Sequence, residues 1–330
     1  MVIIDYDWFI KYMKITQKDI NPFEFSDSNK RYHTMDYYMR HAFGKKACKV
    51  PIDGGFTCPN RDGTKGVGGC TFCSESGSGD FTAGRALSIT EQIDVGAEMM
   101  HKKWAEAILI PYFQSYTNTY APLDILKARY EEALSHPLAK GICIATRGDC
   151  ITPEIAEYLR ELSKKHFVMI ELGLQSANDI TAKRINRCHT FGEFCKGYEL
   201  VKDMFTCVHI INGLIGESRE DMLETAEKVA SLSPSAVKIH LLHIIKGTEA
   251  ERQYHSGELV VMSLAEYVSI VCDQLELLPK ETVIERVTGD GTAETLIAPL
   301  WSKKKLVVQN EIDKELLRRN SFQGSKYRKI

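Results

Sequence analysis

Short apolar runs alternate along the chain with segments whose apolar residues recur at helical spacing. Runs rich in β-branched residues are typical of buried parallel strands, and the amphipathic segments between them are typical of helices that cover a sheet. The predicted strands are 48–52, 107–113, 141–146, 167–172, 207–213 and 236–242, and the predicted helices are 91–104, 123–135, 153–165, 192–204 and 219–231.

Several of these helices carry recognisable start signals. A threonine before a proline places an N-cap ahead of a residue suited to the first helical position. A capping box is indicated where Ser or Thr precedes an acidic residue by three positions. The signals are Thr152 with Pro153, Thr190 with Glu193, and Ser218 with Asp221.

The strand–helix order predicts the fold class. A strand followed by a helix, repeated about six times, requires a parallel sheet with right-handed crossovers. Six units are too few for an eight-stranded barrel, so we expect an α/β fold with a partial (β/α)6 barrel and extensions at both ends. A further helix is expected at 263–278, and a further strand and turn at 282–290. The polar motifs follow strand ends, where the active site of such a barrel lies.

The chain divides best into one core with decorated ends. We expect a helical N-terminal extension at 1–30, a core domain at 31–300 and a basic C-terminal extension at 301–330. The last segment holds nine Lys or Arg against three acids, although the formal net charge of the whole chain is −2. Two interpretations stay open: a solubilising, partly frayed tail, or an arm that contacts phosphates.

Composition narrows the class of protein. With 44% hydrophobic and 26% charged residues, the chain resembles a soluble globular protein. No run reaches the ~20 apolar residues of a membrane span, and the N-terminus lacks the pattern of a signal peptide. We therefore expect a cytoplasmic protein, in which clustered cysteines bind metal more often than they form disulfides.

The polar, glycine-rich segment 53–81 holds Cys58, Cys70 and Cys73. Structural zinc is normally held by four protein ligands, and neither a histidine nor a fourth cysteine at similar spacing lies nearby. Three thiolates leave one metal position open, which favours a four-iron cluster with one iron free for an outside ligand. A zinc site and three unrelated surface thiols stay open as alternatives.

The phrase "CTFC", with Phe72 between the cysteines, resembles the signature of radical SAM enzymes. The longer spacing to Cys58 is similar to that of the branch that contains the Elongator catalytic subunit. The phrases "IELGLQS" and "HIINGLIGE" follow in that family's order, whereas Gly148 and Cys188 depart from its pattern. "RYHTMDYYMRHAFGKK" and "PYFQSYTNTYAP" resemble the short bacterial YhcC/YtqA group. The resemblance covers roughly residues 31–310. It does not include the acetyltransferase half of the Elongator catalytic subunit, so acetyl transfer is not implied.

This resemblance implies a radical SAM barrel with two cofactors. Cys58, Cys70 and Cys73 would bind a [4Fe–4S] cluster, and S-adenosylmethionine (SAM) would chelate its open iron. One electron from a donor such as flavodoxin or ferredoxin would split the sulfonium and give a 5′-deoxyadenosyl radical, so the cofactors carry the chemistry.

The resemblance also implies contacts to SAM. Phe72 would lie beside the cofactors, and Gln114 and Ser115 would contact the methionine ammonium. Glu171 and Gln175 would bind the ribose hydroxyls, although Glu171 could instead be a buried, paired acid. The guanidinium of Arg184 would bind the methionine carboxylate of SAM in bidentate geometry.

Other polar residues receive structural interpretations. A lone histidine near a strand end is usually a packing residue, and cysteines without paired spacing are usually free thiols rather than a second metal site. The residues interpreted in this way are His189, His209, His240, His243, Cys188 and Cys195, together with an Arg147–Asp149 ion pair.

The family resemblance favours one substrate. We expect a radical SAM enzyme that acts on the wobble uridine side chain of tRNA, by remodelling a carboxymethylaminomethyl group. A small-molecule or peptide substrate is the alternative within the enzyme class. A non-catalytic, zinc-bearing RNA-binding module is the alternative outside it.

Overall fold

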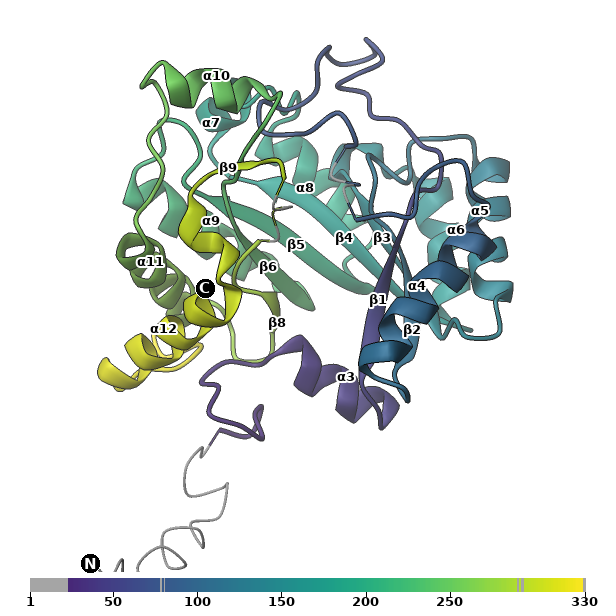
Figure 1. The fold of residues 1–330 in the computed structure, drawn as a ribbon, viewed down its shortest axis with the longest axis horizontal. Helices are drawn as coiled ribbons and strands as arrows, with labels where there is room; N and C mark the ends of the chain where they lie inside the picture. Colours follow the sequence, from purple (N-terminus) through teal and green to yellow (C-terminus); the bar gives the residue numbers. More distant parts are fainter. Residues whose placement is uncertain (1–22, 78, 80, 290, 292–293, 329–330) are drawn as a thin grey trace, which may run out of the picture.

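The computed structural model describes residues 23–328 except 78, 80, 290, 292 and 293. Seven parallel strands form one sheet in the order β1-β2-β3-β4-β5-β6-β8, which curls into an open half-barrel (Figure 1). A short antiparallel pair, β7 with β9, lies apart from it. The strands are β1 (Ala47–Ile52), β2 (Ile108–Phe113), β3 (Gly141–Thr146), β4 (Phe167–Gln175), β5 (Phe205–Asn212), β6 (Ala236–Leu241), β7 (Ile244–Ile245), β8 (Val283–Arg286) and β9 (Leu296–Ala298).

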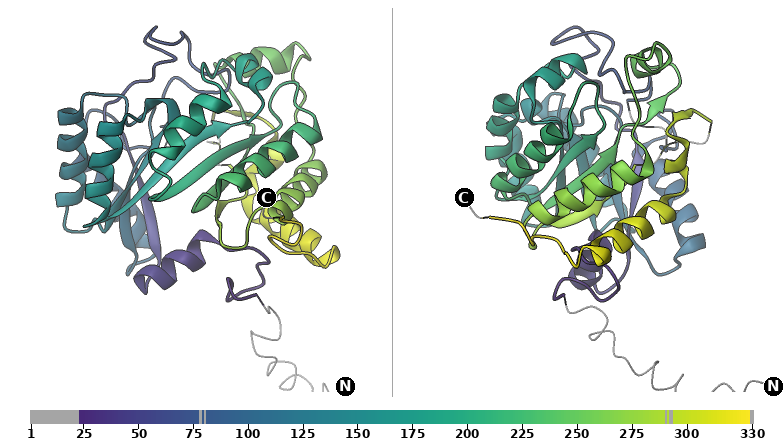
Figure 2. Two further views of the ribbon diagram at one scale, coloured as in Figure 1. Left: turned by 180° about the vertical axis from the view of Figure 1, so that it is seen from behind. Right: turned by 90° about the vertical axis from the view of Figure 1, so that its left-hand side faces the viewer.

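Helices cover the outer face of the half-barrel, as Figure 2 shows from behind. The predicted helices and the three predicted start signals are confirmed, with boundaries shifted by a few residues. The helices are α3 (Met35–Phe43), α4 (Ile89–Lys103), α5 (Leu123–Ser135), α6 (Pro153–Ser163), α7 (Asp179–Arg184), α8 (Phe191–Glu199), α9 (Arg219–Leu232), α10 (Glu249–His255), α11 (Leu264–Leu277) and α12 (Lys305–Arg318), with 3-10 turns at Gly148–Cys150 and Leu300–Lys303.

The predicted strand within 282–290 is confirmed as β8, and it pairs with β6 in the same sheet. The half-barrel therefore has seven strands, one more than the six repeated units indicate. Strand β8 is short and follows α11 without the long apolar run that marks the other strands. Its membership of the sheet depends on pairing with a distant segment, which local pattern does not reveal.

Apolar side chains fill both faces of the sheet. The larger cluster lies between the outer face and the helices. A smaller cluster fills the lower end of the half-barrel, beneath the carboxyl ends of the strands, and α3 closes it by packing against β1 and β8. Its buried members include Ile110, Cys143, Met169 and Cys207, which alternate with outward-facing residues along their strands.

The two ends of the chain differ from expectation. Residues 23–30, the described part of the predicted helical extension, form turns without a helix, while residues 1–22 lie outside the described residues. The polar run 26–30 favours turns, because short hydroxyl and carboxylate side chains bond to nearby backbone. The C-terminal extension is a packed element rather than a frayed tail, because Val308, Ile312 and Leu316 of α12 are fully buried against the core.

None of the helices in the described residues combines the length and the apolar character that a bilayer-crossing helix needs.

Close packing between α8 and the turn after β3 yields a stability prediction. A side chain at Gly197 would overlap the backbone carbonyl of Gly148, and backbone cannot yield as a flexible side chain does. Gly197→Ala should therefore lower the free energy of unfolding by about 1–3 kcal/mol or more, and chemical unfolding measures this change. The control is Gly192→Ala in the same helix, where the nearest atom is 3.9 Å away, so stability should be kept or raised. Equal stability of Gly197→Ala and the parent protein would show that the two backbones are not in contact.

Candidate functional site

A cavity of about 900 Å³ occupies the inside of the half-barrel above its apolar lower end. Its wall combines the loop between β1 and α4 with inward-facing residues of β1, β2, β4, β5, β6 and β8. Ligand pockets typically measure about 300–1,000 Å³, so the volume is at the upper end of that range. The cavity lies where parallel barrels place their active sites.

The three predicted metal ligands meet at this cavity. Cys58, Cys70 and Cys73 all line it, and each is half-buried and not part of a disulfide. Asn60, which is fully buried, fixes the loop by donating to the backbone carbonyls of residues 186–187 at 2.7 and 2.9 Å. Its amide also lies 3.6 Å from the Cys70 sulfur. The loop is therefore tied to the opposite wall before any metal binds.

Arg61 fastens the far end of the same loop. Its guanidinium donates to the carbonyls of Cys73 at 3.2 Å and Ser74 at 2.5 Å, and it lies over the ring of Tyr116. Gly69, with a φ of 79°, passes so close to Arg61 that a side chain there would lie 2.9 Å from the guanidinium. A glycine is needed at this position for both reasons.

Deprotonation of Cys70 is unfavourable without a nearby cation such as a metal. Burial and the neighbouring thiol of Cys73 raise the pKa of Cys70 to about 12, against a lowering effect of Arg147, and Cys58 raises it further. A bound metal centre reverses this balance because it favours the deprotonated ligands. Three thiols that line one cavity, on a loop held by protein contacts, suit an iron–sulfur cluster with three cysteine ligands.

The structure brings some of the other predicted residues to the cavity. Phe72, Gln114, Glu171 and Gln175 line it. Ser115 does not belong to the lining; it is buried next to Gly79, beneath the loop.

Arg184 also lies outside the cavity lining. Its side chain is exposed and donates to the carbonyl of Gly216 at 3.1 Å. In this part of the described chain, it is Arg187, buried and three residues later, that reaches the wall. The SAM contacts assigned to Ser115 and Arg184 therefore stay predictions that their positions do not support.

Gln175 has the geometry of a ligand contact. It adopts a φ of 68°, at a register shift between β4 and β5 that re-aims its side chain. Its buried Oε1 has no hydrogen-bond partner within the described part of the chain. A buried acceptor on a cavity wall is costly unless something binds it, and a ribose hydroxyl is the donor that SAM would present there.

Glu171 is held by an extensive set of partners. It is fully buried and forms ion pairs with Lys49 and, at 2.9 Å, with Lys238. The hydroxyl of Tyr112 donates to it at 2.7 Å, and Nε2 of His209 lies at 2.8 Å. Burial opposes ionisation, but the two ammonium groups hold its pKa well below the usual range. This is the paired-acid alternative, and a contact between Glu171 and ribose stays a prediction.

A second carboxylate completes this ion network. Glu285 pairs with Lys49 at 2.6 Å and with Lys238 at 3.0 Å. Two carboxylates from β4 and β8 thus face two ammonium groups from β1 and β6, and the formal charges cancel. We call Lys49, Glu171, Lys238 and Glu285 the floor network.

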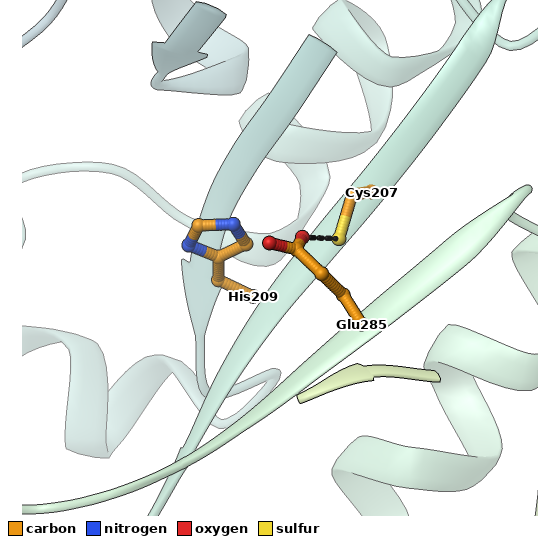
Figure 3. A group of neighbouring side chains, drawn as sticks. All are labelled: Cys207, His209 and Glu285. Atoms are coloured by element: carbon orange, nitrogen blue, oxygen red, sulfur yellow. Dashed lines mark hydrogen bonds between the residues drawn. The ribbon is translucent and has the colours of Figure 1, made fainter. Parts of the chain in front are cut away.

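Figure 3 shows a possible metal-ligating group at the edge of this network. Ligand atoms of Cys207, His209 and Glu285 lie within 4.8 Å of one another. Burial and the carboxylates of Glu285 and Glu171 raise the pKa of Cys207 well above its ordinary value, and its thiol bonds to Glu285 at 3.2 Å. A metal would need the thiolate and would compete with two lysines for Glu285. The geometry therefore favours a hydrogen-bonded group over a second metal site.

Sequence reasoning missed several wall residues. The four histidines interpreted as packing residues all line the cavity, as do both lysines of the floor network. Burial lowers the pKa of each of these histidines, so they are neutral at pH 7. A lysine inside an apolar strand is the sequence signal that could have identified the two lysines as wall residues. Lys49 lies in "CKVPI" and Lys238 in "AVKIHLL".

The predicted Arg147–Asp149 pair is confirmed. The guanidinium donates to both carboxylate oxygens at 2.9 Å, and Lys65 of the cysteine loop reaches the same acid at 2.6 Å. The pair thus helps hold the loop over the cavity. Cys188 and Cys195 form no disulfide, and their assignment as thiols that bind no metal stays a prediction.

The floor network leads to a prediction about pH. Glu285 is buried, and its ammonium partners lower its pKa to about 2. The carboxylate therefore stabilises the fold above the unfolded pKa of about 4.3, and that contribution is lost as the pH falls toward 2. At pH 7, Glu285→Gln should destabilise the fold by about 3–5 kcal/mol, because it leaves buried lysines undercompensated. The difference from the parent protein should shrink between pH 5 and the acid limit of folding.

Chemical unfolding across this pH range measures the effect. The control is Glu106→Gln, which removes an exposed partner of Lys45 and should match the parent protein at every pH. A Glu285→Gln effect that stays constant with pH would contradict the ionised floor network.

Comparisons with known proteins agree with this geometry. The chain matches the model of the Radical SAM superfamily over residues 58–229 and the model of the Radical_SAM C-terminal domain over residues 234–318. The protein YtqA of Bacillus subtilis is 46% identical, over 94% of this chain and 97% of its own length. A tRNA uridine(34) acetyltransferase of Methanocaldococcus infernus is 27% identical over 162 residues, which are 47% of this chain and 30% of that protein.

The solved structure of M. infernus Elp3, with an N-terminal deletion, shares the fold. It superposes with a TM-score of 0.64 at 18% identity, over 84% of this chain and 64% of that chain. The shared fold confirms the expected half-barrel. This chain belongs to the radical SAM superfamily, within the short group that includes YtqA.

Proposed function

We propose that this radical SAM enzyme acts on the wobble uridine side chain of tRNA and remodels a carboxymethylaminomethyl group there. The observation that carries the proposal is the similarity to a tRNA uridine(34) acetyltransferase. That similarity covers less than a third of the other protein, so the acetyl transfer in its name is not part of the proposal. The shared fold with Elp3 adds support for a common core.

Membership of the superfamily makes a [4Fe–4S] cluster and SAM the cofactors of the chain. When bound, they supply one-electron cleavage of the sulfonium and a 5′-deoxyadenosyl radical. In the proposed site, Cys58, Cys70 and Cys73 hold the cluster. The buried acceptor of Gln175 orients SAM, with Gln114 and Phe72 beside it on the wall.

The rest of the cavity suits a second ligand. Neutral histidines and the balanced floor network line it, so these groups offer hydrogen bonds without a large net charge. A uridine side chain that carries an amine and a carboxylate would find both donors and acceptors there. A small-molecule or peptide substrate would use the same cavity and is the competing candidate within the enzyme class.

The remaining parts of the proposal concern partners and location. A one-electron donor such as flavodoxin or ferredoxin is proposed, because cleavage of SAM requires an outside electron. The cytoplasm is the proposed location, because free thiols and a reducible cluster suit a reducing compartment.

The cluster is tested by removing its ligands. Cys58→Ala, Cys70→Ala and Cys73→Ala should each abolish stable iron binding after anaerobic reconstitution, whereas the parent protein should bind about four irons with a brown chromophore. Matched controls are Cys188→Ala and Cys195→Ala, free thiols that should leave iron content unchanged. Full iron in Cys58→Ala would show that another residue is the third ligand. One zinc in the parent protein would favour the non-catalytic RNA-binding module.

The substrate is tested by comparing the nucleosides of total tRNA from a strain that lacks the protein with those of its parent. Mass spectrometry should show a carboxymethylaminomethyl-uridine precursor accumulating in the deletion strain. Expression of the parent protein should restore the product, and the Cys70→Ala protein should not. Identical nucleoside profiles in the two strains would contradict a tRNA substrate and favour a small molecule or peptide.

A further inference from the structure

The half-barrel has an open side between its edge strands β1 and β8, which α3 closes below (Figure 1). The cavity extends to this side. Its lining includes Val95, Met99 and Met100 of α4, which covers β1, and Gly289 and Gly291 just after β8. A ligand can therefore approach laterally, between α4 and the segment that leads to α12.

Basic residues from distant parts of the chain converge at this opening. Lys103 ends α4, Lys305 begins α12 and Arg286 ends β8. Arg286 lines the cavity, and Lys103 follows Met99 and Met100, which line it as well, by one turn of α4. In agreement with this placement, partial burial and then the positive charges of Arg286 and Lys103 lower the pKa of Lys305 to about 8. Lys305 and Arg286 each have a further partner in the chain. An anion bound beside these three side chains would be attracted by all of them.

The later part of the basic C-terminal extension is arranged differently. Lys314 pairs with Glu311 at 2.7 Å, Arg318 pairs with Glu315 at 2.6 Å, and Arg319 lies 2.7 Å from Asp273 of α11. These side chains are matched with acids on α11 and α12. The beginning of the extension, Lys305, instead lies beside Arg286 of the cavity wall and Lys103 of α4.

Apolar and aromatic groups are interleaved with the cations at the opening. Met99 is 63% exposed, and Leu306, which follows Lys305, is 74% exposed. Trp104 follows Lys103, and its ring lies under two ammonium groups, 4.4 Å from that of Lys103 and 4.8 Å from that of Lys46. Cations with exposed flat or apolar side chains suit a ligand that carries both phosphates and bases.

We propose that the surface formed by Met99, Lys103, Trp104, Lys305 and Leu306 is an RNA-docking surface, from which a nucleotide enters the cavity through the open side. The cations would neutralise backbone phosphates, and Trp104 with the apolar groups would contact bases. The inference rests on the proposed function. It assigns the RNA contact to α4 and the first residues of the C-terminal extension, and not to the end of that extension.

An acidic electron-donor protein is the other partner that such charges could attract. RNA is favoured because the surface borders the mouth of the cavity, through which a substrate must pass. The chain's electron-accepting centre would instead lie at the cysteine loop, above the carboxyl ends of the strands. Exposed apolar groups between the cations also fit bases better than a carboxylate-rich protein face.

The test is the affinity of the reconstituted holoenzyme for total bacterial tRNA, measured by fluorescence anisotropy over a salt series. The Lys103→Glu/Lys305→Glu variant should lower the slope of log affinity against log salt by about 1.8, from two lost phosphate contacts. At 0.1 M salt, its affinity should fall about 10- to 100-fold. The matched control is Lys314→Glu/Arg318→Glu, which makes the same charge change at side chains 71% and 73% exposed and should bind tRNA as the parent protein does.

The possible outcomes distinguish failure of the RNA-docking surface from failure of the proposed tRNA substrate. Parent holoenzyme with no salt-dependent tRNA affinity would overturn the tRNA substrate and this inference together. Tight binding by the parent protein and equal binding by Lys103→Glu/Lys305→Glu would overturn the surface and leave the substrate proposal standing. Slower reduction by flavodoxin with unchanged tRNA affinity would assign the surface to the electron donor and overturn its RNA role. Iron content and unfolding midpoint confirm that each variant is folded.

Discussion

An ion pair between the two edge strands holds the open half-barrel in shape. In the described residues, β1 and β8 share no backbone hydrogen bonds, yet Lys49 of β1 meets Glu285 of β8 at 2.6 Å. Lys238 and Glu171 complete the floor network from β6 and β4, so the four charges cancel in a buried position. Removing one member would leave an uncompensated charge, which costs more than the intact network contributes. The spacing of the edge strands is thus set by charge balance as well as by α3.

The location of the site follows from this arrangement. The floor network and the apolar cluster beneath it close the lower end of the half-barrel, so the cavity opens above them and to the side. The cysteine loop begins where β1 ends; Asn60 and Lys65 tie it to Asn186 and Asp149, and Arg61 ties its early part to Ser74. The thiols of Cys58, Cys70 and Cys73 and the unpartnered acceptor of Gln175 therefore face the same space as the neutral histidines. An unclosed barrel leaves a lateral route to that space.

Local pattern predicted much of this from the sequence. The strands, the helices, the capping boxes and the cysteine loop depend on near neighbours, and each of these elements is found where it was expected. The floor network could not be predicted in this way, because Lys49 and Glu285 are 236 residues apart. Arg184 and Ser115 illustrate another limit, since a motif fixes where a residue lies along the chain and not which way its side chain points. For Lys49 and Lys238, the only sequence signal of a buried role is a charged residue within an apolar strand.

The proposed chemistry requires that three thiolates leave a cluster iron open to SAM within this cavity. The direct measurement is the electron paramagnetic resonance spectrum of the anaerobically reconstituted, reduced protein with and without SAM. We predict the signal of a reduced [4Fe–4S] cluster whose g-values change when SAM is added, because SAM would become a ligand of the open iron. A cluster signal that is identical in both samples would contradict it, as would a protein that binds SAM without any iron.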